Sequence, residues 1–148
     1  MEEALSYAMD LRGKPYAWWK GGPIQTGSPM WAEDEPAPLK QDIIAVNCAG
    51  LTNLMLRIVG RSLPYHVSTG RGGTGAYGVV YGPIAVAFDI EESYPRGSLL
   101  LRRYRDEKDQ GHVAVVLDGN GKKAKVLQSH SWGKELPGVN ADYTVEVR

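Results

Sequence analysis

The sequence has a single cysteine, a single phenylalanine, no net charge and no long hydrophobic run. One cysteine excludes an intrachain disulfide and a cysteine-rich zinc site, and with them the class of disulfide-stabilised scaffolds. The 17 lysines and arginines balance the 17 aspartates and glutamates. This balance disfavours nucleic-acid and membrane-surface binding, because both need a basic field. The longest apolar stretches, such as 113–117, are too short to span a membrane.

The length of 148 residues predicts one domain, 1–148, that can bury a core without a metal or a disulfide. No apolar run of signal-peptide length follows the acidic start, so we expect either a cytoplasmic protein or export by a non-classical route. We expect no cofactor and no metal, since the three histidines lack a metal-ligand spacing.

Hydrophobic periodicity predicts helices first and strands afterwards, which is typical of an α+β fold. Apolar residues at helical spacing predict helices over 2–12 and 48–59, each followed by a glycine. Short segments rich in leucine or β-branched residues predict the strands of an antiparallel meander: 99–103, 112–117, 125–129 and 143–147. The composition of 13–40 predicts an ordered irregular loop, and that of 61–95 a turn-rich region with a mobile loop at its centre.

Cys48 stands at the start of the second predicted helix, where backbone N–H groups and the helix dipole stabilise a thiolate. His112 opens a predicted strand and can direct one ring nitrogen toward a neighbouring helix start. Gln128 and His130 lie two residues apart on the next strand, so both face the same side and either could orient the imidazole. The structural alternative is an inert buried cysteine and an ordinary strand-end histidine.

Four short motifs follow one another along the chain: Gly13–Trp18, Asn47–Leu51, Arg96–Leu99 and Gly111–Ala114. In this order they resemble the motifs of the NlpC-type cysteine peptidases, compact papain-like enzymes that are usually peptidoglycan endopeptidases. The related CHAP amidases share the order of cysteine and histidine. The resemblance implies a papain-like α+β fold, with N-terminal helices packed on a small antiparallel sheet.

By this resemblance, Cys48 is the nucleophile, His112 is the base, and Gln128 orients the imidazole, with His130 as the rival for that last role. Tyr16 corresponds to a tyrosine that lines the family's active site, which makes it a candidate for substrate or oxyanion contact.

Trp18 and Asn47 are further candidates for substrate contact. A tryptophan near a cleft can hold a sugar or a peptide, although packing is the commoner role. The family's usual Asp-Cys-Ser-Gly is here Asn47-Cys48-Ala49-Gly50. In the family, the acidic residue and the serine help to bind the free amine of a stem peptide, and a missing carboxylate removes a charge-assisted partner for an ammonium group.

The sequence therefore predicts a cysteine hydrolase, a peptidase or amidase, that cleaves amide bonds. By resemblance, its substrate and partner is a peptide or a peptidoglycan fragment, and a delivered toxin would also bind an inhibitor or immunity protein. Three alternatives stay open: an acyltransferase or transglutaminase-like thiol enzyme, a catalytically inactive binding module on the same fold, and a structural protein. Asn47 and Ala49 favour the binding module.

Overall fold

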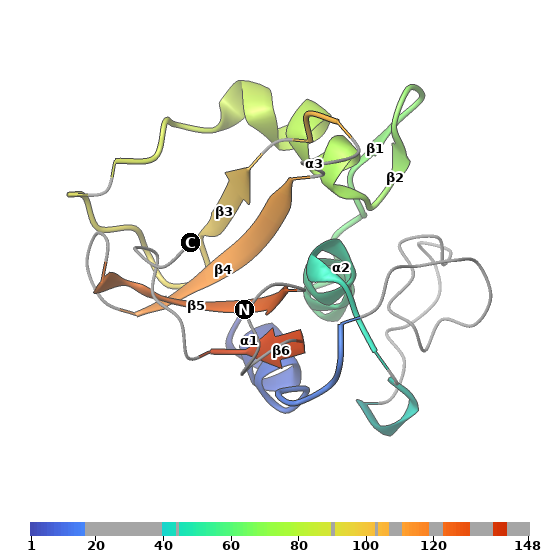
Figure 1. Ribbon diagram of the computed structural model, residues 1–148, viewed down its shortest axis with the longest axis vertical. Helices are drawn as coiled ribbons and strands as arrows, with labels where there is room; N and C mark the ends of the chain where they lie inside the picture. Colours follow the sequence, from blue (N-terminus) through green and yellow to red (C-terminus); the bar gives the residue numbers. More distant parts are fainter. Residues whose placement is uncertain are drawn as a thin grey trace.

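The computed structural model describes residues 1–16, 40–43, 45–89, 91–102, 104–106, 111–118, 123–130 and 138–141. In this part of the chain, three α-helices accompany two small antiparallel sheets (Figure 1). The mixed composition agrees with the predicted α+β class.

The helices are α1 (Glu2–Met9), α2 (Cys48–Ile58) and α3 (Thr74–Tyr81), with 3-10 turns η2 (Lys40–Asp42) and η3 (Gly82–Ile84). Strands β1 (Tyr65–His66) and β2 (Gly70–Arg71) form a hairpin. The main sheet has the order β3 (Leu99–Arg102), β4 (His112–Asp118), β5 (Lys125–His130) and β6 (Gly138–Asn140). All neighbours in this sheet are antiparallel, as expected for a meander.

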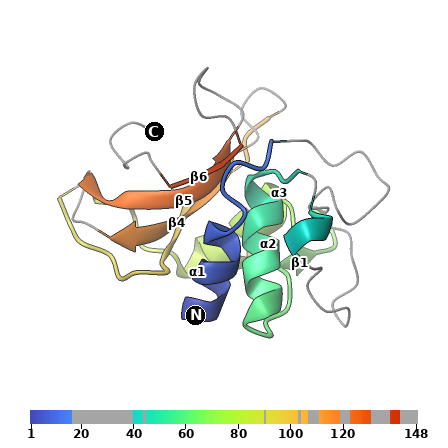
Figure 2. The same cartoon turned by 90° about the horizontal axis from the view of Figure 1, so that it is seen from below.

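Helices α1 and α2 cover one face of the main sheet (Figure 2). Acidic residues in the first turn of α1 suit the positive end of its dipole, and Asn47 caps the N-terminus of α2. The apolar stripes of both helices meet the sheet in one core, to which Leu5, Leu54 and Leu127 contribute fully buried side chains. Each such side chain contributes about 2 kcal/mol relative to an exposed one.

The motif Arg96–Leu99 leads into β3 and joins it to the start of the chain. Gly97 has a φ of +89°, and a Cβ there would overlap the side chain of Met1. Arg96 Nε donates to Glu2 Oε1 at 2.9 Å, and this hydrogen bond lowers the pKa of the Glu2 carboxyl. The motif thus fixes the edge strand against α1.

The expectation of a mobile loop within 61–95 is wrong, because this region contains β1, β2, α3 and η3. Gly75 and Gly78 lower the helix propensity of α3 and hide it from a periodicity argument. Tertiary packing stabilises the helix instead. Tyr77 is fully buried, and Gly75 lies close enough to Thr69 that a Cβ would touch its side chain at 3.4 Å.

Other boundaries differ less. The first helix ends at Met9 rather than Arg12, and residues 10–13 form a turn that still buries Leu11. The short strand β6 was not expected, and the strand expected at 143–147 lies outside the described residues. Among the helices that the structure describes, none combines the length and apolar composition that crossing a membrane requires.

Candidate active site

Cys48 is the first residue of α2, and its position depends on the cap of that helix. Asn47 adopts an extended conformation and accepts a hydrogen bond from the Gly50 N–H at its Oδ1, with a distance of 2.6 Å. Thr52 Oγ1 donates to the Cys48 carbonyl at 3.2 Å. The side-chain oxygen of Asn47 therefore serves as a helix cap, a role that the sequence analysis did not assign to it.

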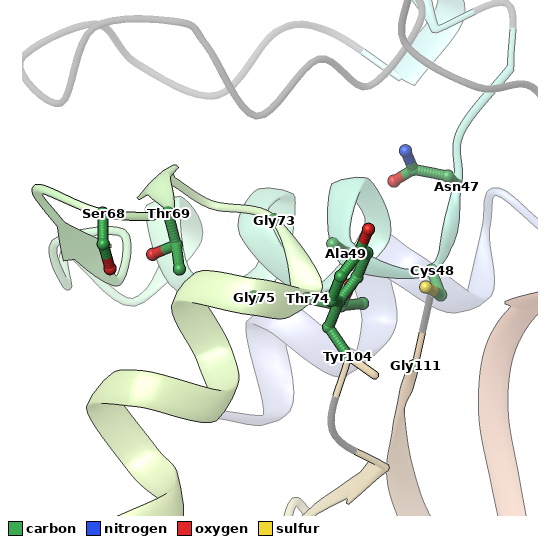
Figure 3. A pocket seen from close by; sticks show the side chains of 10 residues that line it. All are labelled: Asn47, Cys48, Ala49, Ser68, Thr69, Gly73, Thr74, Gly75, Tyr104 and Gly111. Carbon is green, nitrogen blue, oxygen red and sulfur yellow. The ribbon is translucent and has the colours of Figure 1, made fainter. Parts of the chain in front are cut away.

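Cys48 is buried, with 6% of the residue exposed, and it lines one end of a cavity of about 390 Å³ (Figure 3). The α2 start forms one end of the cavity, and the β1–β2 turn, with Ser68 and Thr69, lies at the end away from the sulfur. The start of α3 lies between them. The remaining lining residues are Asn47, Ala49, Gly73, Thr74, Gly75, Tyr104 and Gly111. A buried cysteine at a helix start thus borders a space large enough for a peptide-sized group.

His112 and Gln128 form a buried hydrogen-bonded pair. His112 Nε2 lies 3.0 Å from Gln128 Oε1, and only 4% and 1% of the two residues is exposed. Val115 pairs with Leu127 across β4 and β5, so His112 and Gln128 lie on one face of the sheet. Because an amide oxygen only accepts, His112 Nε2 carries the proton of this bond.

His130 lies on the same face of β5 as Gln128, opposite Gly138 of β6, and is fully buried. Ser129 points to the other face, and its hydroxyl donates to the Val46 carbonyl at 2.8 Å. This bond fixes β5 to the segment that precedes Cys48. Gln128, the predicted orienting residue, thus hydrogen-bonds His112.

The start of β4 lies at the N-terminus of α2. Gly111 lines the cavity together with Cys48, and Val113 packs with Cys48 and Ala49 in one apolar cluster. These are the two sequence neighbours of His112, which is the first residue of β4. The backbone at the start of β4 therefore lies next to the start of α2.

Tyr16 belongs to a short segment that follows the first turn of the chain. The Pro15 carbonyl accepts from the Val46 N–H at 3.1 Å, and the Lys14 carbonyl accepts from the Val139 N–H at 2.9 Å. Burial, followed by the charge of the Cys48 thiolate, raises the pKa of the Tyr16 hydroxyl above its ordinary value. The Tyr16 hydroxyl therefore keeps its proton, whereas Trp18 lies outside the described residues.

Two buried residues near Cys48 were missed by the sequence analysis. Tyr77 packs with Cys48 and Ala49, and its hydroxyl donates to Asn53 Oδ1 at 2.9 Å. Burial is the main cause that raises the pKa of Tyr77, with smaller effects from the charges of Tyr81 and Cys48. The sequence gives no signal for this pair, because Asn53 lies on the side of the second predicted helix opposite its apolar stripe, where a polar residue is ordinary.

Within the described ranges, no group of three histidine, cysteine or acidic residues could hold a metal ion. Comparison of the chain with protein-family models, with curated proteins and with solved structures found no match. The functional interpretation therefore depends on the geometry above and on the motifs of the sequence.

Proposed function

We propose that this protein is a papain-like cysteine hydrolase that cleaves amide bonds, with peptidoglycan peptides as its leading substrate. The observation that carries the proposal is the buried hydrogen bond between His112 and Gln128, in a strand start packed at the helix start of Cys48. A nucleophile, a base and an orienting residue from distant parts of the sequence are the usual components of thiol catalysis.

The hydrogen bond to Gln128 assigns the roles of the two ring nitrogens. Since Nε2–H donates to Gln128 Oε1, Nδ1 is the nitrogen that takes the proton from the Cys48 thiol. The thiolate then attacks the carbonyl carbon, and a C–S bond forms. When the C–N bond breaks, His112 returns the proton to the leaving amine. Water, deprotonated by His112, finally hydrolyses the thioester and regenerates the thiol.

The oxyanion of the intermediate needs hydrogen-bond donors at the helix start. We assign this role to the backbone N–H of Cys48 and to the hydroxyl of Tyr16, whose pKa is raised by burial and, second, by the charge of Cys48. Because that pKa is raised, the hydroxyl keeps its proton at pH values at which the thiol is ionised.

The proposal is tested with purified peptidoglycan fragments and mass spectrometry of the products. The sample is divided, and one portion is alkylated with iodoacetamide, which modifies a single thiol because Cys48 is the only cysteine. We expect the untreated portion to cleave the amide bond and the alkylated portion to leave it intact. Absence of any thiol-dependent product would refute the proposed substrate, and transfer to an added amine in place of hydrolysis would establish an acyltransferase.

Thiol reactivity tests the enzyme class independently of the substrate. The rate of alkylation by iodoacetamide is measured against pH, and we expect its midpoint below the ordinary thiol value of about 8.5. The reason is that a helix N-terminus and a protonated imidazole both stabilise a thiolate. A midpoint at the ordinary value would instead favour the inactive binding module.

Replacement of Gln128 with leucine is expected to lower kcat by about tenfold to a hundredfold. Leucine has a similar size but leaves His112 Nε2–H buried without its acceptor, and such a loss costs about 1–3 kcal/mol. Steady-state kinetics on the cleaved fragment measures the effect. His130→Leu on the same face of β5 is the matched variant, and a larger loss of kcat there would assign the orienting role to His130.

Replacement of Tyr16 with phenylalanine is expected to lower kcat by about a hundredfold, the usual effect of removing one oxyanion donor. The pH midpoint of Cys48 alkylation should change little, because the Tyr16 hydroxyl is uncharged in this pH range and its removal takes no charge away from the thiol. Kinetics and alkylation are measured on the same preparation. An unchanged kcat would exclude the hydroxyl from the oxyanion site.

A further inference from the structure

A buried polar bridge joins α2 to the opposite wall of the cavity. Asn53 lies five residues after Cys48 on α2, and its Nδ2 donates to the Gly72 carbonyl at 2.9 Å. Its Oδ1 accepts from the Tyr77 hydroxyl, also at 2.9 Å. Asn53 and Tyr77 are both fully buried. We call Asn53, Gly72 and Tyr77 the brace.

The brace holds both ends of the α3 start, which we call the wall (residues 73–75). Gly72 directly precedes the wall and is itself fixed by its N–H, which donates to the Pro64 carbonyl at 2.8 Å. Tyr77 follows the wall within the first turns of α3. One asparagine side chain on α2 therefore bonds to the backbone before the wall and to a side chain after it.

Apolar packing also joins α3 to the start of α2. Tyr77 packs with Cys48 and Ala49, and this packing has no preferred direction along the surface. Hydrogen bonds, in contrast, fix distance and angle. The two bonds of Asn53 therefore fix the position of the wall relative to α2, the helix that begins with Cys48.

We propose that Asn53 and Tyr77 are positioning residues that set the width of the cavity and thereby select the substrates that reach Cys48. The selection of a cleaved substrate depends on the proposed function. The brace itself contains none of the proposed catalytic residues. Removal of the brace widens the cavity, admits bulkier reagents to the sulfur and weakens the fit of the natural substrate.

The test compares Tyr77→Phe with the matched control Tyr81→Phe, whose ring lies on the same helix at 5.7 Å from that of Tyr77. Cys48 is alkylated with iodoacetamide and, separately, with the bulky iodoacetamidofluorescein, which has the same reacting group. For Tyr77→Phe we expect the ratio of bulky to small rates to rise by about tenfold, which is the usual effect of one buried hydrogen bond. Tyr81→Phe should keep the wild-type ratio.

Two further variants extend this test. Asn53→Asp keeps the acceptor for Tyr77 and removes the donor to Gly72, so its ratio should also rise. Gly73→Leu should lower the ratio, because a Cβ at this position meets no atom within 4 Å and the new side chain fills the cavity. Gly73 has a φ of −89°, which any residue adopts.

The outcomes separate the brace from the proposed function. If hydrolysis is absent but the ratio rises in Tyr77→Phe, the proposed function fails and the brace is supported. If hydrolysis is present, Tyr77→Phe should raise KM and leave kcat and the pH midpoint of alkylation unchanged. A lower melting temperature with an unchanged ratio and an unchanged KM would show a purely structural role and overturn the inference.

Discussion

Alanine at either Cys48 or His112 is expected to lower kcat/KM for a peptidoglycan peptide by about a thousandfold or more. In the proposed mechanism, Cys48 supplies the attacking sulfur, and His112 accepts and returns the proton. The described residues that line the cavity offer no second thiol and no imidazole, since apart from Cys48 they are glycines or carry a methyl, hydroxyl or amide group.

The double variant should be no less active than the more damaged single variant. Residues that act as one unit show this non-additivity, because removal of either partner already stops the shared step. Initial rates of the two single variants and the double variant measure it. Losses that multiply in the double variant would contradict a shared proton-transfer step and would separate Cys48 from His112.

The stability of the same variants provides the necessary control. His112→Ala leaves Gln128 Oε1 buried without its donor, and we expect a loss of about 1–3 kcal/mol in the free energy of unfolding. Asp118→Ala lies at the exposed far end of the same strand and should change neither stability nor rate appreciably. The loss of kcat/KM in His112→Ala should therefore be far larger than the loss that its unfolded fraction alone would cause.

The parts of the site that could be predicted from the sequence are those that follow from local periodicity. The helix beginning at Cys48 has an apolar stripe and a terminal glycine, and the strand beginning at His112 is a short β-branched run. Alternation along a strand predicted which residues of β5 share one face, and the structure pairs Gln128 from that face with His112. The catalytic roles of these residues stay predictions.

The cavity wall could not be predicted, because tertiary contacts stabilise it against local preference. Gly75 and Gly78 argue against a helix at 74–81, yet a fully buried Tyr77 and the two hydrogen bonds of Asn53 hold it in place. The strand β6 has three residues and starts with glycine, so it has no periodicity to detect. The strand β6 contacts the N-terminal segment through backbone hydrogen bonds between Val139 and both Gly13 and Lys14.

Gly138 lies at this contact, and its replacement with alanine is expected to destabilise the protein by about 2–5 kcal/mol. Gly138 has a φ of +93°, which costs any other residue about 1–2 kcal/mol. A Cβ would also lie 2.2 Å from the Lys14 carbonyl oxygen and 3.0 Å from the Pro15 Cα. Both are backbone atoms, which cannot change rotamer to relieve the overlap, so the backbone at Lys14 and Pro15 must shift.

Gly13→Ala is the matched control, because Gly13 has a φ of +91° but an added Cβ there meets no atom within 4 Å. Chemical denaturation should give a loss of only about 1–2 kcal/mol for this variant. The excess loss in Gly138→Ala measures the close approach of β6 to Lys14 and Pro15. Because Tyr16 follows these residues, the folded fraction of Gly138→Ala should also lose kcat, as Tyr16→Phe does. Equal losses of stability in the two glycine variants, with kcat retained in both, would show that this contact neither stabilises the fold nor places Tyr16.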